Sequence, residues 1–281
     1  MTVTLDRVSK RYGRRRPWVV HEVDVDLLEA TTTLLTGANG SGKTTLLRIV
    51  AGLTLPSDGT VRGRPRRVAV VPDRFVAPVR MTGRAYLRHH ARIRGLSAGQ
   101  ADQRIDELTE RLGIAPGLEF AIQDLSKGNA QKVSLSQAFL AHVDLLVLDE
   151  PKTALDARGQ AVLDELVEGS VEAGSTVILS DPTPGHRPTA TCYRLGGGHL
   201  EPVEVGQPES VTRVRIRLRA DGTAGDERAL STLVKLASAS SSADGLLTIV
   251  VDERHCDDAL RLALANRWSV LEVLPDPPPL R

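Results

Sequence analysis

The 281-residue chain is poor in aromatic side chains, poor in cysteine and without long apolar runs. Aromatic residues make up only 3% of it, which argues against a stacking platform for single-stranded nucleic acid. Its two cysteines, Cys192 and Cys256, lie far apart, so the sequence predicts neither a disulfide framework nor a zinc site and favours a reducing cytoplasm. No stretch approaches the roughly 18 apolar residues of a membrane-spanning helix, so any membrane role would require a partner.

The chain also lacks an excess of charge of either sign. It has 36 Lys and Arg residues against 35 Asp and Glu residues, a formal net charge of +1. No nucleic-acid partner is therefore expected, because generally basic domains are typical of that class. Hydrophobic residues at 41% and charged residues at 25% are typical of a globular protein with a substantial core.

Short apolar segments alternate with helical ones through the first 200 residues. Strands are predicted at 3–5, 23–27, 31–36, 67–71, 145–148 and 176–179, and helices at 45–53, 102–112 and 132–141. Short apolar strands that alternate with helices are typical of a parallel sheet covered on both faces. The sequence therefore predicts an α/β fold with a parallel-sheet core.

The composition changes near Glu201, where the segment 201–210 contains two prolines and is typical of a linker. Beyond it, strands at 211–219, 246–251 and 270–274 and helices around 226–237 and 257–266 are predicted. We expect a first domain over 1–203, a small α+β domain over 204–274 and a Pro-rich tail at 275–281. Four arginines alternate in the first of these strands and should share one face, most simply a solvated one.

The segment Gly37–Thr44 reads GANGSGKT and fits the phosphate-loop pattern G-x-x-x-x-G-K-[ST]. Glycines let successive backbone N–H groups turn toward phosphate oxygens, and the helix that follows adds its positive end. Lys43 would contact the β- and γ-phosphates, and the Thr44 hydroxyl would ligate Mg²⁺. Because a strand precedes the loop and a helix follows it, a nucleotide site is favoured over a chance glycine turn.

Asp149 and Glu150 follow the apolar strand 145–148 directly. Ligands of parallel sheets collect at the carboxyl ends of the strands. Asp149 is expected to hold Mg²⁺, and Glu150 to orient and deprotonate an attacking water. Alone, the pair could be a solvated strand end closed by Pro151, but beside a phosphate loop it predicts nucleoside triphosphate hydrolysis. No plausible N-K-x-D motif is found, so a GTPase is disfavoured.

Residues 125–131 read LSKGNAQ, which resembles the LSGGQ signature of ATP-binding cassette (ABC) ATPases, with Lys127 for the first Gly and Asn129 for the Gln. The resemblance covers about residues 1–203 and implies a P-loop NTPase fold with an inserted helical subdomain at about 75–140. It also implies a head-to-tail dimer in which this signature contacts the γ-phosphate bound by the other subunit. An ordinary Ser-capped helix is the alternative interpretation.

Two more segments resemble motifs of the same family. Tyr12, in KRYG, resembles the aromatic residue that stacks on adenine, although a plain surface or core tyrosine remains possible as an alternative. Thr153–Asp156, TALD, resembles the D-loop that crosses the dimer interface. The nucleotide-binding residues so implied are Tyr12, Gly37, Ala38, Asn39, Gly40, Ser41, Gly42, Lys43, Thr44, Thr45, Ser126, Gly128, Asn129 and Asp156. The cofactors implied are ATP and Mg²⁺.

The chain departs from the family pattern at two positions. Asp73 stands where the Q-loop glutamine is expected; it can contact Mg²⁺ or water but cannot donate as an amide does. Asp181 and Pro182 stand where the switch histidine is expected, and His186 on the following loop is either its substitute or merely exposed. The catalytic set is therefore Glu150, Lys43 and Asp73, the Mg²⁺ ligands are Thr44, Asp149 and Asp73, and we expect slow hydrolysis.

The sequence thus predicts the ATP-hydrolysing subunit of an ABC transporter. The C-terminal domain resembles that of ATPase subunits of ABC-2-type exporters, which implies a separate transmembrane permease at the inner face of the cell membrane and a homodimer or heterodimer of ATPase subunits. A soluble ABC ATPase acting on ribosomes or DNA is disfavoured, because one phosphate loop and no sustained heptads are present. A nucleotide-gated regulatory module is favoured by the missing histidine and opposed by Glu150.

Overall fold

A computed structural model of the protein describes residues 2–73, 75, 80–114, 116–181, 190–203, 213–220, 233, 237–243, 246–266 and 268–276. Two compact units make up the chain, Met1–Gly206 and Gln207–Arg281. Each unit has hydrophobic clusters of its own, so each is described by itself.

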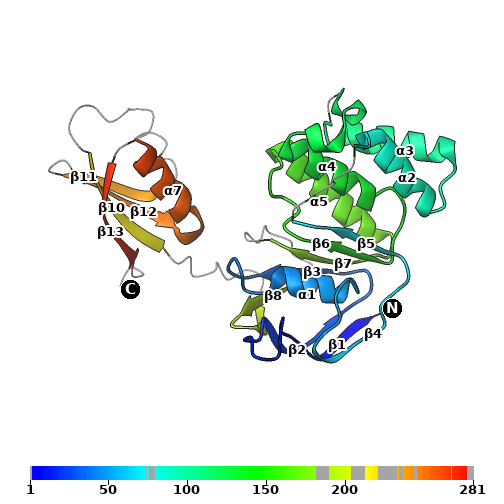
Figure 1. Cartoon of the computed structure of the whole chain (residues 1–281), viewed down its shortest axis with the longest axis horizontal. Helices are drawn as coiled ribbons and strands as arrows, with labels where there is room; N and C mark the ends of the chain where they lie inside the picture. The colour runs from blue at the N-terminus through cyan, green and yellow to red at the C-terminus, as the bar shows by residue number, and fades with distance from the viewer. Residues whose placement is uncertain are drawn as a thin grey trace. The chain divides into compact units, whose positions relative to one another are not determined.

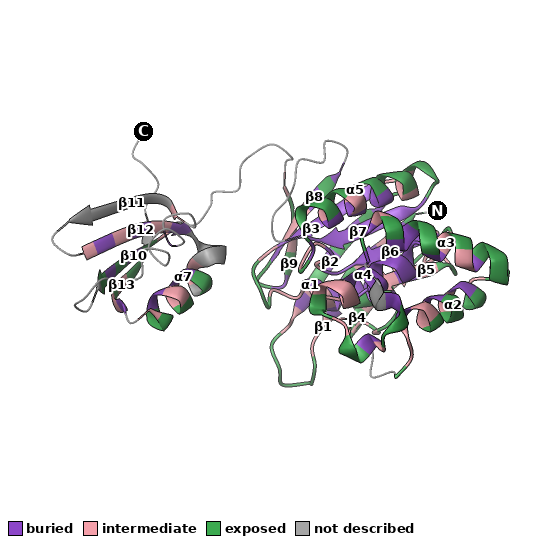
Figure 2. Cartoon of the chain, turned by 90° about the horizontal axis from the view of Figure 1, so that it is seen from above, coloured by how far each residue is buried: buried purple, intermediate pink, exposed green. Residues whose placement is uncertain are grey.

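A six-stranded sheet in the order β5-β6-β7-β3-β8-β9 is the centre of the first unit (Figure 1). Its strands are β3 Thr32–Thr36, β5 Val68–Val71, β6 Leu145–Leu148, β7 Thr176–Ser180, β8 Thr191–Gly196 and β9 His199–Val203. The pairs from β5 to β8 are parallel, and only β8 and β9 pair antiparallel. Every residue of β3, β6 and β7 is buried (Figure 2), as expected for parallel strands covered on both faces, and the predicted parallel-sheet core is confirmed.

Helices cover one face of this sheet. They are α2 Gly83–Ile93, α3 Ala98–Arg111, α4 Lys127–Ala138 and α5 Ala157–Glu172, with short 3₁₀ helices at Pro116–Glu119 and Ile122–Asp124. Side chains at alternate strand positions, such as Leu34 and Leu146, pack against them in one hydrophobic cluster. Helix α4 begins five residues earlier than the predicted 132, because the Ser126 hydroxyl accepts the backbone N–H of Asn129 and caps the helix there.

The opposite face packs on helix α1 Lys43–Val50 and on an antiparallel sheet of order β2-β1-β4. Its strands are β1 Val3–Lys10, β2 Val20–Leu27 and β4 Asp58–Arg62. Leu35 and Ile178 of the central sheet share a hydrophobic cluster with Leu5 of β1 and Leu46 of α1. Strand β4 was not predicted, because its sequence DGTVR offers one large apolar residue and no buried side chain.

The second unit contains an antiparallel sheet of order β11-β12-β10-β13 and helix α7 Glu253–Ala265. Its strands are β10 Arg213–Ala220, β11 Ala237–Ala243, β12 Leu246–Asp252 and β13 Trp268–Asp276. In β10 the side chains of Ile216 and Leu218 are buried and those of the arginines at 215, 217 and 219 are exposed, so the alternation places arginine on the solvated face.

Two boundaries in this unit differ from the prediction. A helix was expected around 226–237, but its last residue, Ala237, is the first residue of strand β11. Most of the rest of that range lies outside the described residues. Strand β13 continues through Pro275 and Asp276, two residues into the expected tail, since both pair with the first residues of β10.

Candidate nucleotide-binding site

The loop between β3 and α1 depends on glycines with positive φ. The φ angles are +140° at Gly37, +80° at Gly40 and +109° at Gly42. A Cβ atom on Gly37 would lie 2.4 Å from the backbone oxygen of Leu195, and one on Gly42 would lie 2.6 Å from that of Val19. Both positions therefore exclude any side chain, through backbone conformation and through space. The predicted phosphate loop has the compact backbone that its glycines require.

Lys43 is the first residue of α1, and its side chain folds back over the loop. The ammonium donates to the carbonyl oxygens of Gly37, at 2.8 Å, and Ala38, at 3.1 Å, and lies 3.9 Å from Oε1 of Glu150. The residue is only 5% exposed. A buried ammonium is costly unless it is paired, so these three oxygens hold the charge in place. Phosphate oxygens would be stronger partners for it than neutral carbonyls.

Asp149 and Glu150 are joined through a buried serine at the end of the neighbouring strand. The Ser180 hydroxyl donates to Oδ1 of Asp149 at 2.8 Å and accepts the backbone N–H of Glu150, also at 2.8 Å. Asp149 is 5% exposed, and Ser180 is fully buried. One hydroxyl thus fixes the carboxylate and the backbone of the next residue, which itself has a φ of +45°. This bridge leaves the second oxygen of Asp149 available to a ligand.

The pKa of Glu150 is raised, first by burial and then by the negative charge of Asp73. Lys43 opposes this shift, while Asp149 and Asp181 add to it. Burial and nearby negative charges both disfavour the ionised form of a carboxyl group. Four carboxylates lie at this sheet edge, and Lys43 is the positive charge that offsets their effect on Glu150. A raised pKa in a cleft is typical of a group that exchanges protons in a reaction.

A pocket of about 490 Å³ brings most of the phosphate-loop prediction together at the carboxyl edge of the central sheet. Its lining residues are Val19, Asn39, Gly40, Gly42, Lys43, Thr44, Thr45, Asp73, Lys127, Glu150 and Thr153. Eight of these were predicted as site residues from the sequence. Asp73, from the end of β5, and Glu150, from the end of β6, face the loop because these strands run parallel.

Other predicted site residues lie beside this pocket rather than in its lining. Gly37 and Ala38 supply the carbonyls that hold Lys43, Asp149 is covered by Ser180, and the buried Ser41 hydroxyl has no partner among the described residues. Tyr12 is 59% exposed, and its hydroxyl lies 3.2 Å from that of Thr45. Tyr12 therefore presents an exposed aromatic ring next to the phosphate loop, with the Lys10 ammonium 5.4 Å from the ring centroid.

The signature segment forms the start of helix α4. Gly128 approaches the loop after Glu150 so closely that a Cβ atom would lie 3.0 Å from the carbonyl oxygen of Ala154. Asp156 caps α5 by accepting the N–H of Gly159 at 2.7 Å, and its pKa is lowered by this bond and by Lys132 at 3.6 Å. Asp156 is thus engaged in capping, and among Ser126, Gly128, Asn129 and Asp156 none lines the pocket of its own chain.

Sequence reasoning missed four residues at this site. Lys127 lies in the signature segment, where it was interpreted only as a departure from the family pattern, and Thr153 was interpreted only as part of the D-loop. No pattern in the sequence pointed to Val19. Ser180 could have been found only from the parallel register, which places Leu148 opposite Leu179 and so brings the following residues side by side. Side chains from distant segments meet here because strand order, not sequence order, sets their neighbours.

At the expected switch-histidine position the structure describes Asp181 but neither Pro182 nor His186, which lie outside the described residues. Asp181 is buried, its N–H donates to the carbonyl oxygen of Leu35, and its carboxylate lies 3.8 Å from the ammonium of Lys152. A carboxylate therefore stands at the end of β7, next to the pocket.

Comparison with known proteins agrees with this geometry. The model of the ABC transporter family matches residues 20–153. The "Probable metal transport system ATP-binding protein" of Treponema pallidum is 31% identical over 180 residues, which are 63% of this chain and 74% of that protein. The chain belongs to the ABC transporter family, among its ATP-binding proteins.

Two further proteins are similar to this ABC protein. The Nod factor export ATP-binding protein I of Cupriavidus metallidurans is 32% identical over 184 residues, 62% of this chain and 60% of that protein. The chain thus spans about three fifths of the length of this relative. A solved structure, the dimeric structure of a bacterial ABC transporter cassette, superposes with a TM-score of 0.63 at 21% identity, over 71% of this chain and 96% of that one, and shows the shared fold.

Proposed function

We propose that this ABC protein hydrolyses ATP and thereby powers a separate membrane permease, as the ATPase subunit of an exporter. The observation that carries the proposal is the convergence of Lys43, Thr44 and Glu150 on one pocket at the end of the parallel sheet. The name of the Cupriavidus relative, an export ATP-binding protein, supports the direction of transport. Among the described residues, no helix is long and apolar enough to cross a bilayer.

The residues present fit a nucleotide and Mg²⁺. The glycine loop offers backbone N–H groups where no Cβ atom could be placed, and Lys43 offers a buried cation. Among the described residues no three His, Cys, Asp or Glu side chains could hold a metal ion together. Thr44 and Asp149, with Asp73 nearby, would instead hold Mg²⁺ jointly with phosphate oxygens, the arrangement that this ion prefers. The bound Mg²⁺ would neutralise phosphate charge.

Glu150 is the proposed general base. Its carboxylate lies at the pocket wall, 3.9 Å from Lys43, and its backbone is fixed by Ser180. A raised pKa makes the carboxylate a better proton acceptor once it is ionised. Asp181 is the reason that we propose slow turnover, because a carboxylate at the switch position offers no N–H donor to a γ-phosphate and adds negative charge.

We also propose that two cassettes enclose ATP between them, with Ser126, Gly128 and Asn129 of one facing the phosphate loop of the other. Their positions outside the lining of their own chain's pocket support a role in trans. The name of the similar solved structure, a dimeric cassette, supports the same arrangement. Tyr12 would stack on the adenine base, since its ring is open to solvent beside Thr45.

The direct test is to purify the chain from membranes and to assay ATP hydrolysis with and without Glu150→Gln. We expect a polytopic membrane protein to accompany it and the substitution to abolish turnover while ATP binding remains. Glu172→Gln, an exposed residue at the end of α5, is the matched control and should leave turnover unchanged. ATP binding without any turnover by the unaltered protein, alone or with its membrane partner, would favour a nucleotide-gated regulatory module instead.

A further inference from the structure

The nucleotide pocket contains a second basic residue besides Lys43. The described residues that line it include two lysines, Lys43 and Lys127, and two acidic residues, Asp73 and Glu150. Carbonyl oxygens of the phosphate loop hold Lys43, whereas Lys127 forms no hydrogen bond or ion pair with a described residue. We propose that Lys127 binds the terminal phosphate of the nucleotide in its own chain's pocket and so selects a triphosphate over a diphosphate. This proposal rests on the ATP binding proposed above.

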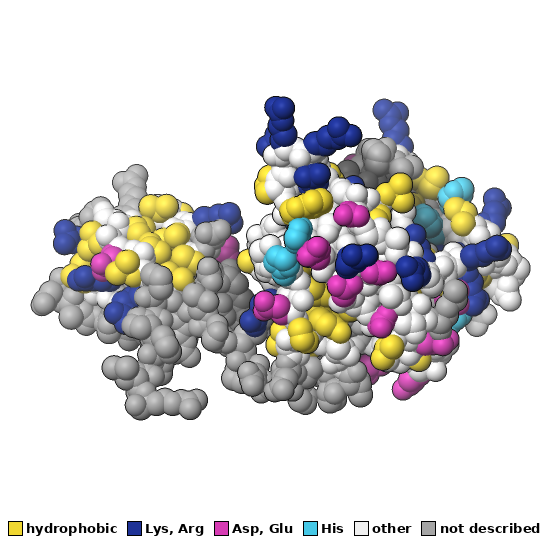
Figure 3. Space-filling view, turned by 90° about the horizontal axis from the view of Figure 1, so that it is seen from below, with side chains coloured by type: hydrophobic (Ala, Val, Ile, Leu, Met, Phe, Trp, Pro, Cys, Tyr) yellow, Lys and Arg dark blue, Asp and Glu magenta, His cyan; other side chains and the backbone are white. Residues whose placement is uncertain are grey.

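The exposure of a lysine does not by itself indicate a ligand. On the face of the first unit that Figure 3 shows, basic side chains are exposed among acidic ones. Lys127 is exposed too, but it borders the pocket that the phosphate loop lines. Its neighbours Ser126, Gly128 and Asn129 do not line that pocket. Of the residues 126–129, Lys127 alone therefore borders its own chain's pocket, and its flexible four-carbon side chain can reach into it.

The start of helix α4 packs closely on the loop that follows Glu150. A Cβ atom on Gly128 would lie 3.0 Å from the carbonyl oxygen of Ala154. Thr153 of the same loop lines the pocket together with Lys127. This packing fixes the backbone of Lys127 near the wall that carries Glu150, the proposed general base. Since a base must be within reach of the water that attacks the terminal phosphate, that phosphate would lie close to Lys127.

The charges at this wall explain why a triphosphate would require a second cation. Four carboxylates lie at this sheet edge, and two of them, those of Asp73 and Glu150, belong to residues in the pocket lining. Like charges repel, so a terminal phosphate is disfavoured here unless positive charge offsets the repulsion. The Lys43 ammonium is already shared between two carbonyl oxygens and Glu150. The ammonium of Lys127 is available for the phosphate because no described residue pairs with it.

Lys127 also occupies a position where a lysine is unfavourable for the helix. It is the first residue of α4, and the first turn contains no acidic residue. The helix dipole opposes a positive charge near a helix N-terminus. The ABC signature that this segment resembles has glycine here, so the lysine is an addition of this chain. Anion binding in the pocket accounts for this lysine, whereas helix stability does not.

The test is to titrate the full chain calorimetrically with ADP and with an ATP analogue that has a nitrogen between its β- and γ-phosphates and is not hydrolysed. Both titrations contain Mg²⁺ and use a concentration at which light scattering shows a single chain. Lys127→Gln removes the charge and keeps a polar side chain. It should weaken binding of the analogue about fivefold and change the affinity for ADP less than about twofold. Lys127→Arg keeps the charge and should restore most of the loss.

Arg158→Gln is the matched control, because Arg158 is an exposed cation in the first turn of α5 and does not line the pocket. It should leave both affinities unchanged. Thermal unfolding checks that the variants are folded, and loss of a cation at a helix start should not lower the melting temperature.

Three results would overturn the role of Lys127. They are equal losses for the analogue and for ADP, equal losses in Lys127→Gln and Arg158→Gln, and a loss that appears only at concentrations where scattering shows a dimer. An unchanged ratio of the two affinities in Lys127→Gln would also overturn it, and would leave the ATPase proposal intact. Failure of the unaltered protein to bind the analogue would contradict the ATPase proposal itself, and this one with it.

Discussion

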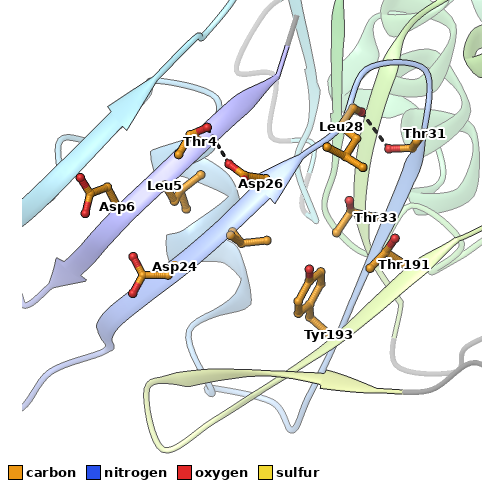
Figure 4. A pocket seen from close by; sticks show the side chains of 11 residues that line it. Thr4, Leu5, Asp6, Asp24, Asp26, Leu28, Thr31, Thr33, Thr191 and Tyr193 are labelled. Carbon is orange, nitrogen blue, oxygen red and sulfur yellow. Dashed lines mark hydrogen bonds between the residues drawn. The ribbon is translucent and has the colours of Figure 1, made fainter.

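The polar groups at the two ends of strand β3 differ in the contacts that the rest of the protein makes with them. At the carboxyl end, Lys43 and Glu150 are held by short, specific contacts from backbone and side chains. At the amino end, the Thr33 hydroxyl forms no hydrogen bond with a described residue, and Thr33 lines a hollow of about 670 Å³ (Figure 4). The polar groups at the carboxyl end are thus fixed by contacts within the protein, whereas at the amino end a hydroxyl lines an open hollow without such a contact.

The difference follows from how each end is assembled. The phosphate loop is one contiguous segment whose glycines fold it locally, so its geometry does not wait for distant partners. The hollow at the other end is formed by residues of β1, β2, β3 and β8, and it exists only because two sheets diverge there. A contiguous motif can therefore be predicted from the sequence, whereas a pocket formed between two sheets cannot.

The largest expected effect concerns the glycine loop itself. Gly42→Ala should abolish nucleotide binding and lower the free energy of unfolding by about 3 kcal/mol, because the new methyl group meets the Val19 carbonyl and φ is +109°. Gly40→Ala is the control, since its φ is also positive but nothing lies within 4 Å of its Cβ position. It should cost only about 1 kcal/mol. Equal losses in chemical denaturation would contradict the claim that space, and not φ alone, excludes a side chain at position 42.

A smaller loss is expected when the bridge between the two carboxylate residues is removed. Ser180→Ala leaves the Glu150 N–H and one Asp149 oxygen without their partner in a buried site, so the free energy of unfolding should fall by about 2 kcal/mol and ATPase activity should drop. Ser134→Ala is the matched control, because this fully buried hydroxyl has no partner among the described residues. Thermal unfolding of the two variants separates a structural bridge from the mere burial of a serine.

The pH dependence of activity tests the crowding of carboxylates at this end. Asp181 raises the pKa of Glu150, so Asp181→Asn should lower that pKa. A general base must be ionised, so the acidic limb of the kcat profile should move to lower pH in this variant. Asp164→Asn is the control, because Asp164 shares Lys152 with Asp181 but is not among the groups that shift Glu150. An unmoved acidic limb would show that Asp181 does not act on the base.

Much of the site at the carboxyl end of β3 could be predicted from the sequence. The pattern G-x-x-x-x-G-K-[ST] fixes a backbone shape, and an apolar strand that ends in Asp-Glu places carboxylates at the carboxyl edge of a parallel sheet. Ser180 was missed because its role depends on the register of β6 with β7. Lys127 was missed because motif comparison treats a substituted position as a loss, although the structure places it at the wall of the pocket.

The rest of the fold shows the same limit. The apolar strands β3, β6 and β7 were predicted because full burial on both faces makes them visibly apolar. Strands β4 and β11 were missed, since DGTVR and ASASSSA carry few large apolar side chains and pair at the edges of their sheets. Edge strands are specified by their neighbours more than by their own composition.

The smallest change in the free energy of unfolding is expected for a substitution at the amino end of β3. Whether this change is a gain or a loss is what tests the comparison. Thr33→Val replaces a hydroxyl that forms no hydrogen bond with a described residue by a methyl group of similar size, so no partner in the protein is lost and the free energy of unfolding should rise by up to about 1 kcal/mol. Thr176→Val is the contrasting control, because the Thr176 hydroxyl donates to the Leu28 carbonyl at 3.1 Å and its removal should destabilise. If both variants lose stability equally, the Thr33 hydroxyl already has a partner in water, and the contrast between the two ends of β3 disappears. If only Thr33→Val gains stability, the Thr33 hydroxyl contributes no hydrogen bond to the fold, and the contrast between the two ends of β3 holds.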